Sequence, residues 1–343
     1  MTYSRGLIVA ILGVGVFSAG FAIRYHIVKI RMDRLRHVAA PATYFPAGSI
    51  WTQDVSQVPV DPESSARINW LATQNGGWGT GKMRVDFAIR VLQADAKSPF
   101  VPFRKGPGFY GEASDVVATL PLPVGGGMEG QKGYHCPLAE QDCHLIVVDR
   151  ANSKLYAAFQ ADLGDGAVNA IFLAVWDLNR LYPMSGRGEQ CTSADAAGFP
   201  IAPLLFNADE LATGSINHAI RFILPNWRMR TGVFVHPATH AGGPDGPESA
   251  PPYGAHFRLK ASYDLSRLKP AARVVARAMQ KYGMLLADGG DIALTAQNDA
   301  DTVAKYSDVD FGSNDLQSLK VTDFEVIRGG KPIPLTNDCV RNP

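Results

Sequence analysis

An uncharged stretch near the N-terminus is the feature that most limits how this chain can fold. Residues 6–23, GLIVAILGVGVFSAGFAI, run for 18 positions without a charge, which is just long enough to cross a bilayer as a helix. The stretch also fits a signal peptide, because Arg5 precedes it and small residues stand at positions 18–20. We therefore predict that residues 1–39 are a membrane anchor or signal segment with a basic juxtamembrane helix.

Two opposing features bear on which side of the membrane the rest of the chain occupies. Only Arg5 precedes the uncharged stretch, whereas five basic residues follow it closely: Arg24, Lys29, Arg31, Arg34 and Arg36. The positive-inside rule then leaves the body of the chain in the cytoplasm. The chain also has 4 cysteines, an even number that favours an oxidising compartment. We expect a single-pass protein of the inner membrane whose body faces the periplasm or exterior; the alternative is a body that faces the cytoplasm.

The remaining residues predict one globular domain. Pro41, Pro46 and Pro59 mark residues 40–60 as a linker, which leaves residues 61–343 as a single domain. Hydrophobic residues make up 46% of the chain and charged residues 19%, a balance typical of globular proteins. Lys and Arg number 33 against 32 Asp and Glu, so no strong field attracts nucleic acid, and no nucleic-acid partner is expected.

Short apolar runs separated by turns dominate the predicted domain. Residues 144–149 and 154–159 flank a turn and predict a hairpin, and residues 270–282 predict a helix that begins at Pro270 and ends before Gly283. The other expected elements are a helix over 61–73 and strands at 83–92, 167–175, 217–224, 232–236, 254–263 and 284–287. Because strands and helices do not alternate regularly, the predicted class is α+β: a mainly antiparallel β-sandwich or barrel with a few helices, behind one N-terminal hydrophobic helix.

Cysteine spacing limits the covalent chemistry. In an oxidising compartment the simplest pairing is Cys136–Cys143 and Cys191–Cys339, although three pairings are open in principle. The cysteines are spaced too widely for a haem attachment site or for the tight pairs of a zinc site. No cofactor is expected.

Four segments occur in order and resemble an exported bacterial domain family that stands behind signal peptides, often beside other secreted modules. They are LIVVDRANSKLY (145–156), TSADAAGFPIAPLLFNADELATGSINHAIRFILP (192–225), PPYGAHFRLKASYDL (251–265) and ARVVARAMQKYGMLLADGG (272–290). The resemblance covers residues 76–326 and implies export and a single domain, but it implies no reaction and no catalytic residues. Relatives continue after the position of Gly290 with a polar and aromatic stretch, whereas this chain has Asp291-Ile292-Ala293-Leu294. A site lined by that stretch in relatives is therefore altered here.

A basic strand face is the first candidate binding surface. Within residues 254–263, His256, Arg258 and Lys260 alternate with apolar residues and so share one face of a strand. Joined by basic side chains from neighbouring strands, this face would suit a glycan that carries uronate or phosphate. The predicted ligand-binding residues are Arg221, His236, His240, His256, Arg258 and Lys260. The alternative is a solvated strand face with surface ion pairs.

Carboxylates are the main candidates for catalysis, because glycoside cleavage needs two of them about 5 to 9 Å apart. The predicted catalytic residues are Asp195, Asp209, Asp288 and His218. Each has a structural alternative: a helix cap for Asp195 and Asp209, a turn for Asp288 and a buried, satisfied histidine for His218. No metal site is predicted, since Pro237 disfavours the helix on which a histidine pair at 236 and 240 would bind an ion.

These features lead to two hypotheses of function. The first is a membrane-anchored extracytoplasmic domain that binds a glycan or glycopolymer of the cell envelope and, as a hydrolase, cleaves it. The second is a non-enzymatic, membrane-anchored structural or assembly component that binds protein partners. In both, residues 6–23 hold the protein to the membrane.

Overall fold

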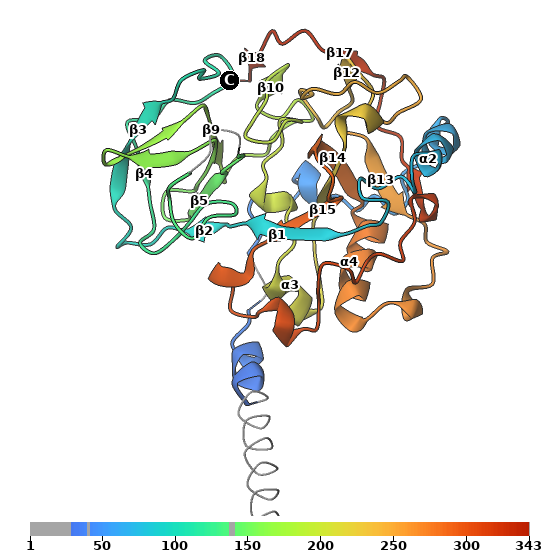
Figure 1. Cartoon of the computed structure of the whole chain (residues 1–343), viewed down its shortest axis with the longest axis horizontal. Coiled ribbons are helices and arrows are strands. Elements are labelled where there is room, and N and C mark those ends of the chain that lie inside the picture. The colour runs from blue at the N-terminus through green and yellow to red at the C-terminus, as the bar shows by residue number, and fades with distance from the viewer. Residues whose placement is uncertain (1–28, 40–41, 137–140, 343) are drawn as a thin grey trace, which may run out of the picture.

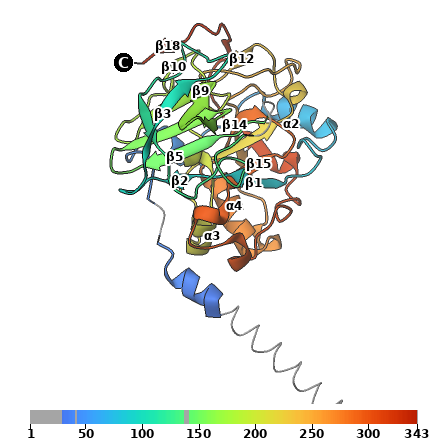
Figure 2. The ribbon, with the colours of Figure 1, turned by 60° about the vertical axis from the view of Figure 1, so that its left-hand side comes forward.

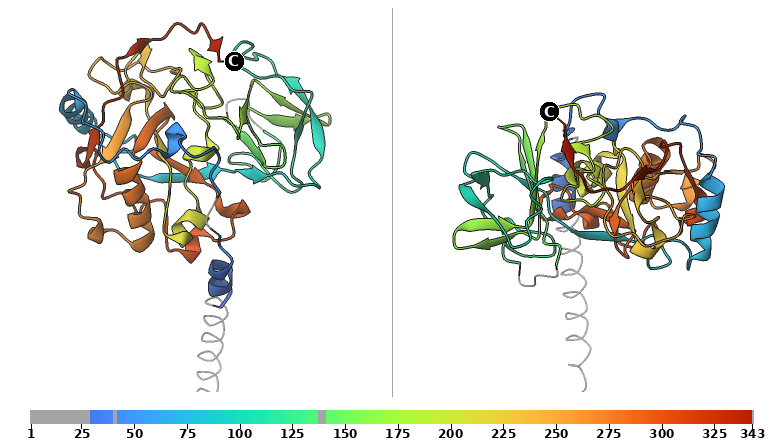
Figure 3. Two further views of the ribbon diagram at one scale, coloured as in Figure 1. Left: turned by 180° about the vertical axis from the view of Figure 1, so that it is seen from behind. Right: turned by 90° about the horizontal axis from the view of Figure 1, so that it is seen from above.

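The structure, a computed structural model, describes residues 29–39, 42–136 and 141–342. Two β-rich lobes lie side by side (Figure 1 and Figure 3). We call residues 92–178 the β lobe, and residues 42–91 and 179–342 the sheet lobe. The sheet lobe contains a six-stranded sheet, and the β lobe contains two four-stranded sheets.

The six-stranded sheet mixes parallel and antiparallel pairs. Its order is β1 (Val85–Ile89), β15 (Leu294–Gln297), β11 (Ile220–Leu224), β14 (Met284–Gly289), β13 (His256–Leu259) and β16 (Phe324–Val326). β1 runs parallel to β15 and β11 runs parallel to β14, and the other neighbours are antiparallel. The helices of this lobe are α2 (Ser64–Thr73), α3 (Ala208–Thr213) and α4 (Pro270–Lys281). α4 starts at a proline in its first turn and is followed by Gly283 at φ 70°, a conformation that glycine adopts without strain.

The β lobe is joined to the sheet lobe through a strand that is buried on both faces. One of its sheets has the order β2 (Leu92–Gln93), β5 (Leu145–Asp149), β6 (Lys154–Phe159) and β9 (Phe172–Asp177). The other has the order β4 (Thr119–Pro121), β3 (Phe100–Lys105), β8 (Ala167–Ala170) and β7 (Asp162–Gly164). Leu145 and Val147 of β5 pack into the apolar cluster of the β lobe, whereas Ile146 and Val148 pack into the main core. Successive residues of β5 therefore bury apolar surface in both lobes.

The C-terminal segment returns across the top of the molecule as drawn in Figure 1. β17 (Ile333–Pro334) pairs with β12 (Val233–Phe234), and β18 (Val340–Arg341) pairs with β10 (Gly188–Glu189). Short 3₁₀ helices complete the fold at Ile50–Thr52, Ala202–Leu204, Asn226–Arg228, Leu265–Arg267, Asp299–Asp301, Tyr306–Asp308 and Val321–Asp323. A Cys191–Cys339 disulfide fastens this segment, and a Cys136–Cys143 disulfide closes a loop of the β lobe. The expected pairing of the cysteines is thus confirmed.

The predicted class agrees with the structure at its coarser level. The fold is a mixture of helices and mostly sheets, and its strand pairs are mainly antiparallel. The hairpin of β5 and β6 and the helix α4 are confirmed, with β5 and β6 paired residue by residue from Leu145↔Ala158 to Asp149↔Lys154. The expectation of a barrel is not met, because no sheet in the described part of the chain closes on itself and three of the sheets include parallel pairs.

Residues 42–60, which their prolines mark as a linker, pack against the rest of the sheet lobe. Phe45 and Trp51 are buried in the main core, where the Trp51 and Phe199 rings lie 5.3 Å apart. The backbone carbonyls of Val55 and Val58 accept hydrogen bonds from Arg258. Buried aromatic rings and shared hydrogen bonds make this segment a part of the folded body.

Residues 29–36 form a helix that projects from the body on the side away from β12 and β17 (Figure 1 and Figure 2). Arg34 of this helix lies 2.5 Å from the buried carboxylate of Asp308, which ties the helix to the sheet lobe. The predicted membrane stretch at 6–23 lies outside the described residues. Within the described ranges, no helix combines the length and the apolar character that a membrane span requires.

Candidate active site

A pocket of about 830 Å³ lies where the two lobes meet, and we call it the cleft. Its walls come from three parts of the chain: the β lobe, the strand ends and loops of the sheet lobe, and the C-terminal segment. They include Tyr110, Glu112, Asp142, His144, Phe159, Asn226, His240, Tyr253, Asp288, Leu335, Asn337 and Cys339. Aromatic rings and a few polar groups that converge on one concave surface are typical of ligand sites.

Beneath the cleft on the sheet-lobe side lies an arginine held between two carboxylates. Arg221 comes from β11, and its Nη2 lies 2.8 Å from Asp195 Oδ2 and 3.6 Å from Asp288 Oδ2. Its Nη1 donates to the Thr295 hydroxyl of β15 at 2.6 Å. Arg221 and Asp195 are almost completely buried, whereas the side chain of Asp288 is 29% exposed. Asp288, from the end of β14, is therefore the member of this group that a ligand reaches.

Burial governs the electrostatics of the inner pair. It raises the pKa of Asp195 to about 7, against the attraction of Arg221, which lowers it, and the Asp288 carboxylate raises it further. Asp195 accepts hydrogen bonds from the Arg221 guanidinium and from the backbone N–H of Ala197. Such a pair fixes the position of its guanidinium, because a buried charge is stable only when it is paired and hydrogen-bonded.

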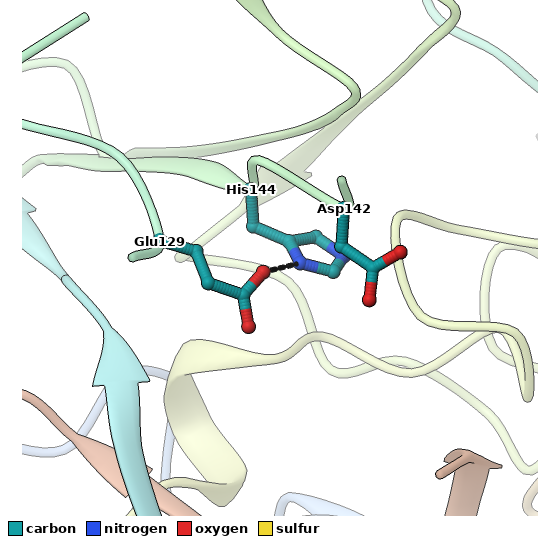
Figure 4. Close-up of side chains that lie close together, drawn as sticks. All are labelled: Glu129, Asp142 and His144. Carbon is teal, nitrogen blue, oxygen red and sulfur yellow. Dashed lines mark hydrogen bonds and ion pairs between the residues drawn. The ribbon is translucent and has the colours of Figure 1, made fainter. Parts of the chain in front are cut away.

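A second group, Glu129, Asp142 and His144, lies on the β-lobe side (Figure 4), where Asp142 and His144 line the cleft. His144 directly precedes β5, and its Nδ1 lies 2.6 Å from Glu129 Oε2. Its Nε2 lies 2.8 Å from the backbone carbonyl oxygen of Ala194 in the sheet lobe. Asp142 lies on the other side of the ring from Glu129, next to the Cys136–Cys143 disulfide. Cys143 of this disulfide stands between Asp142 and His144, so the bond fixes the backbone that carries both side chains.

The bonding of His144 matches a protonated ring. Burial opposes the charge on His144, but the Glu129 carboxylate outweighs it and raises the pKa of His144 to about 9. Burial also opposes the charge on Glu129 and by itself would raise the pKa of that carboxyl. The attraction and hydrogen bond of His144 more than offset this, so that the pKa of Glu129 is below its usual value. An imidazolium donates from both nitrogens, which suits an acceptor at each of them.

The same group has the spacing of a metal site. Glu129, Asp142 and His144 offer ligand atoms that all lie within 4.8 Å of one another. A metal ion binds the free lone pair of an imidazole nitrogen. Both nitrogens of His144 already face oxygen atoms of the chain, so this arrangement favours the ion pair with Glu129 over a bound metal.

Asp142 differs in its surroundings from Asp288. Partial burial raises the pKa of Asp142, His144 lowers it, and the Glu129 and Asp288 carboxylates raise it. Asp288 instead lies beside Arg221 and accepts hydrogen bonds from the backbone N–H groups of Ala196 and Gly289. The cleft thus holds two carboxyl groups in unlike environments, the condition under which one can donate a proton and the other accept one.

Two of the sequence-predicted residues, Asp288 and His240, line this cleft. Two more, Arg221 and Asp195, are buried beneath it, where Arg221 pairs with both Asp195 and Asp288. His240 faces the backbone oxygen of Ala196 at 2.9 Å and the side-chain oxygen of Asn337 at 3.0 Å, and so links the sheet lobe to the C-terminal segment.

Two other predicted catalytic residues lie at a separate pocket of about 320 Å³ beside α3. His218 faces Glu210 at 3.1 Å, and burial, which lowers its pKa, is outweighed by Glu210, which raises it. Asp209 accepts hydrogen bonds from the backbone N–H groups of Val303 and Ala304. Both side chains bond to neighbouring residues around α3, and neither lines the cleft.

The predicted basic strand face does not form part of the cleft, and neither does His236. Arg258 bonds to Glu325 and to carbonyls of residues 55–58, Lys260 donates to the carbonyl of Thr322, and His236 pairs with Glu189. His256 faces the carbonyl of Tyr282 at 2.8 Å, and its burial lowers its pKa to about 4. Strand β16 and residues 55–58 cover the face that the alternation pattern leaves open, so these side chains bond to the protein itself.

Sequence reasoning missed Glu129, Asp142 and His144. The nearest available indication was Cys143, which stands between two of them and whose disulfide fixes their position. Glu129 has no such marker, because it comes from a loop that meets His144 only in the folded chain.

Comparison with known proteins adds no relative: no family model, no curated protein and no solved structure matches this chain.

Proposed function

We propose that the cleft binds a glycan of the cell envelope and cleaves it by hydrolysis. The observation that carries this proposal is the presence of two carboxyl groups, Asp142 and Asp288, in unlike surroundings in one pocket of about 830 Å³. Aromatic rings at Tyr110, Phe159 and Tyr253 give the pocket apolar surface for the faces of sugar rings. Asn226 provides amide groups for sugar hydroxyls.

In the proposed reaction Asp142 is the general acid. Its pKa is raised by partial burial, which favours the protonated form that a proton donor needs. The proton passes from Asp142 to the glycosidic oxygen as the bond between that oxygen and the anomeric carbon breaks. Asp288, oriented by Arg221, takes a proton from the water whose oxygen bonds to the anomeric carbon. Asp195 holds Arg221 and is a positioning residue, since it lies beneath the cleft.

The cellular setting is part of the same proposal. The two disulfides are typical of a protein outside the cytoplasm, and the uncharged stretch at residues 6–23 supplies an anchor or a signal peptide. We therefore propose a body that faces the periplasm or exterior, close to the membrane, where envelope glycans are the available polymers.

The test measures release of reducing ends from a panel of envelope polysaccharides. We expect Asp142→Asn and Asp288→Asn each to lower the rate at least about a hundredfold, in line with the usual contribution of a general acid or base. Asp165→Asn is the matched control: Asp165 is exposed in a β-lobe turn at φ 49°, where asparagine fits as well as aspartate. If no polysaccharide is cleaved by the folded wild-type protein, or if the control loses as much activity as Asp142→Asn, the hydrolase proposal is wrong.

A further inference from the structure

The pocket of about 320 Å³ beside α3, which we call the α3 pocket, lies apart from the cleft. Among the described residues, the two pockets have no lining residue in common. In Figure 1, α3 lies at the lower end of the body, near the helix at 29–36, whereas the C-terminal segment that lines the cleft crosses the top. We infer that the α3 pocket binds a small uncharged sugar, and this inference does not depend on the proposed hydrolysis in the cleft.

Two almost fully buried side chains of the α3 pocket have polar groups that the fold leaves unbonded. Trp51 is 1% exposed, and its Nε1–H is buried without a hydrogen-bond partner in the described part of the chain. Gln297, at the end of β15, is 6% exposed, and no described residue bonds to its side-chain amide. Because an unbonded buried polar group is costly, such groups are rare in folded proteins. A ligand with hydroxyl groups supplies the partners that both side chains lack.

The hydroxyl of Tyr44 is a third polar group of this pocket with no hydrogen-bond partner among the described residues. Its ring centre lies 5.1 Å from the guanidinium carbon of Arg150, which holds the ring in place. Burial raises the pKa of Tyr44, so the hydroxyl stays protonated and can donate. Tyr44, Phe45 and Trp51 also bring aromatic rings to the pocket, and such rings offer apolar surface to the faces of a sugar ring.

Two of the three carboxyl groups in the described lining are already paired with cations of the chain. Asp301 accepts two hydrogen bonds of 2.8 Å from Arg90, which lies outside the lining. Glu210 lies 3.1 Å from His218. Burial lowers the pKa of His218, but Glu210 raises it by more, which favours the charged form of the ring. These two pairs cancel their own charge.

The other charged side chains of the described lining, Arg150 and Asp209, have opposite signs. Asp209 accepts hydrogen bonds from two backbone N–H groups, and Arg150 donates to two backbone carbonyls. The lining therefore carries no excess charge of either sign. A phosphate or ammonium group would lose its hydration here without a free counter-charge, which favours an uncharged ligand.

The size and the neutral groups of the α3 pocket agree with a sugar. Its volume of about 320 Å³ is at the lower end of the range of roughly 300 to 1,000 Å³ that is typical of ligand pockets, and so suits a small molecule better than a polymer. The side chains of Gln93, Asn207 and Asn217 add amide groups to the lining. An amide both donates and accepts, as a sugar hydroxyl does.

The experiment follows the indole N–H signal of Trp51 by NMR in the full chain, where its loss in Trp51→Phe assigns it. The uncharged probes are glucose, galactose and N-acetylglucosamine. The charged probes are their 6-phosphates and the amines glucosamine and galactosamine, all at about pH 6, below the ordinary pKa of histidine. We expect at least one uncharged sugar to shift the signal saturably and to bind at least about threefold more tightly than its charged forms.

Variants separate a ligand contact from general damage. Gln297→Leu and Tyr44→Phe each remove one polar group and should weaken binding about three- to tenfold. Tyr44→Phe removes a hydroxyl without a described partner, so it should leave stability unchanged and remains informative if Gln297→Leu unfolds. Gln317→Leu is the matched control, because Gln317 is exposed and lies outside the lining. This control and Asp288→Asn in the cleft should both leave sugar binding unchanged.

Three outcomes would overturn the inference. The first is that no uncharged sugar shifts the Trp51 signal, which would mean that the unbonded groups meet water only. The second is that a charged form binds as tightly as its uncharged parent, or that Tyr44→Phe binds as tightly as the wild type. The third is that Asp288→Asn abolishes the shift, which would assign the sugar to the cleft. None of these results decides the hydrolase proposal, which the release of reducing ends tests separately.

Discussion

The Nε2 atom of His144 lies 2.8 Å from the carbonyl oxygen of Ala194, and this hydrogen bond joins the β lobe to the sheet lobe at the wall of the cleft. The opposite nitrogen of the same ring lies 2.6 Å from Glu129. Because the ring accepts nothing and donates twice when it is protonated, its charge state determines whether both bonds form. The hydrogen bond that joins the lobes on this side of the cleft therefore depends on one proton.

Stability should fall as pH rises through the pKa of this ring. The folded-state pKa of His144 is raised from 6.5 to about 9, so the folded protein binds the proton more tightly than the unfolded chain. The contribution is complete below pH 6.5 and is lost as pH approaches 9, with a size on the order of 3 kcal/mol or less. Urea unfolding across this range should show a decline for the wild type that is absent in His144→Gln. Parallel curves for the two proteins would contradict the expectation.

The Arg221–Asp195 pair should be costly to break from one side only. Arg221→Met leaves the carboxyl of Asp195 buried without its cation, a change that typically costs about 3 to 5 kcal/mol. The double variant Arg221→Met with Asp195→Asn removes the stranded charge and should recover part of that loss. Chemical denaturation of wild type and both variants measures the difference. A double variant no more stable than Arg221→Met would show that the charge is not the cause.

The two disulfides should differ in their effect on stability. Cys191 and Cys339 are separated by 148 residues and Cys136 and Cys143 by 7, so chain entropy predicts losses of about 5 and about 2 kcal/mol when each bond is removed. Paired Cys→Ala variants and thermal unfolding test the order. The Cys191–Cys339 variant should also bind glycan more weakly, because Leu335, Asn337 and Cys339 line the cleft. Equal losses in stability would contradict the chain-entropy argument.

Sequence patterns predicted those helices and strands whose ends are determined by residues close together in the chain. The β5–β6 hairpin has a four-residue connection, and α4 has its start and stop residues next to it, so local pattern was sufficient. The cleft brings together Asp142 and Asp288, which are far apart in sequence and come from different lobes. No spacing rule links such residues, because their proximity depends on how the lobes pack.

The basic strand face shows a different limit. Alternation at His256 and Arg258 assigns these side chains to one face of a strand, but it does not say what covers that face. In the structure Glu325 of β16 and the carbonyls of residues 55–58 cover it and bind Arg258. The same packing makes residues 42–60 part of the body, although their prolines predict a linker.

Truncation tests that role of residues 42–60. A chain that begins at residue 42 keeps Trp51, which is 1% exposed in the main core, and the carbonyls that bind Arg258. A chain that begins at residue 61 loses both, and removal of one buried tryptophan alone typically costs about 3 to 5 kcal/mol. We expect the first to unfold cooperatively and the second to be aggregated or largely unfolded by circular dichroism. Trp51→Ala in the longer chain should show an intermediate loss. If the chain that begins at residue 61 is as stable as the longer one, residues 42–60 are a linker after all.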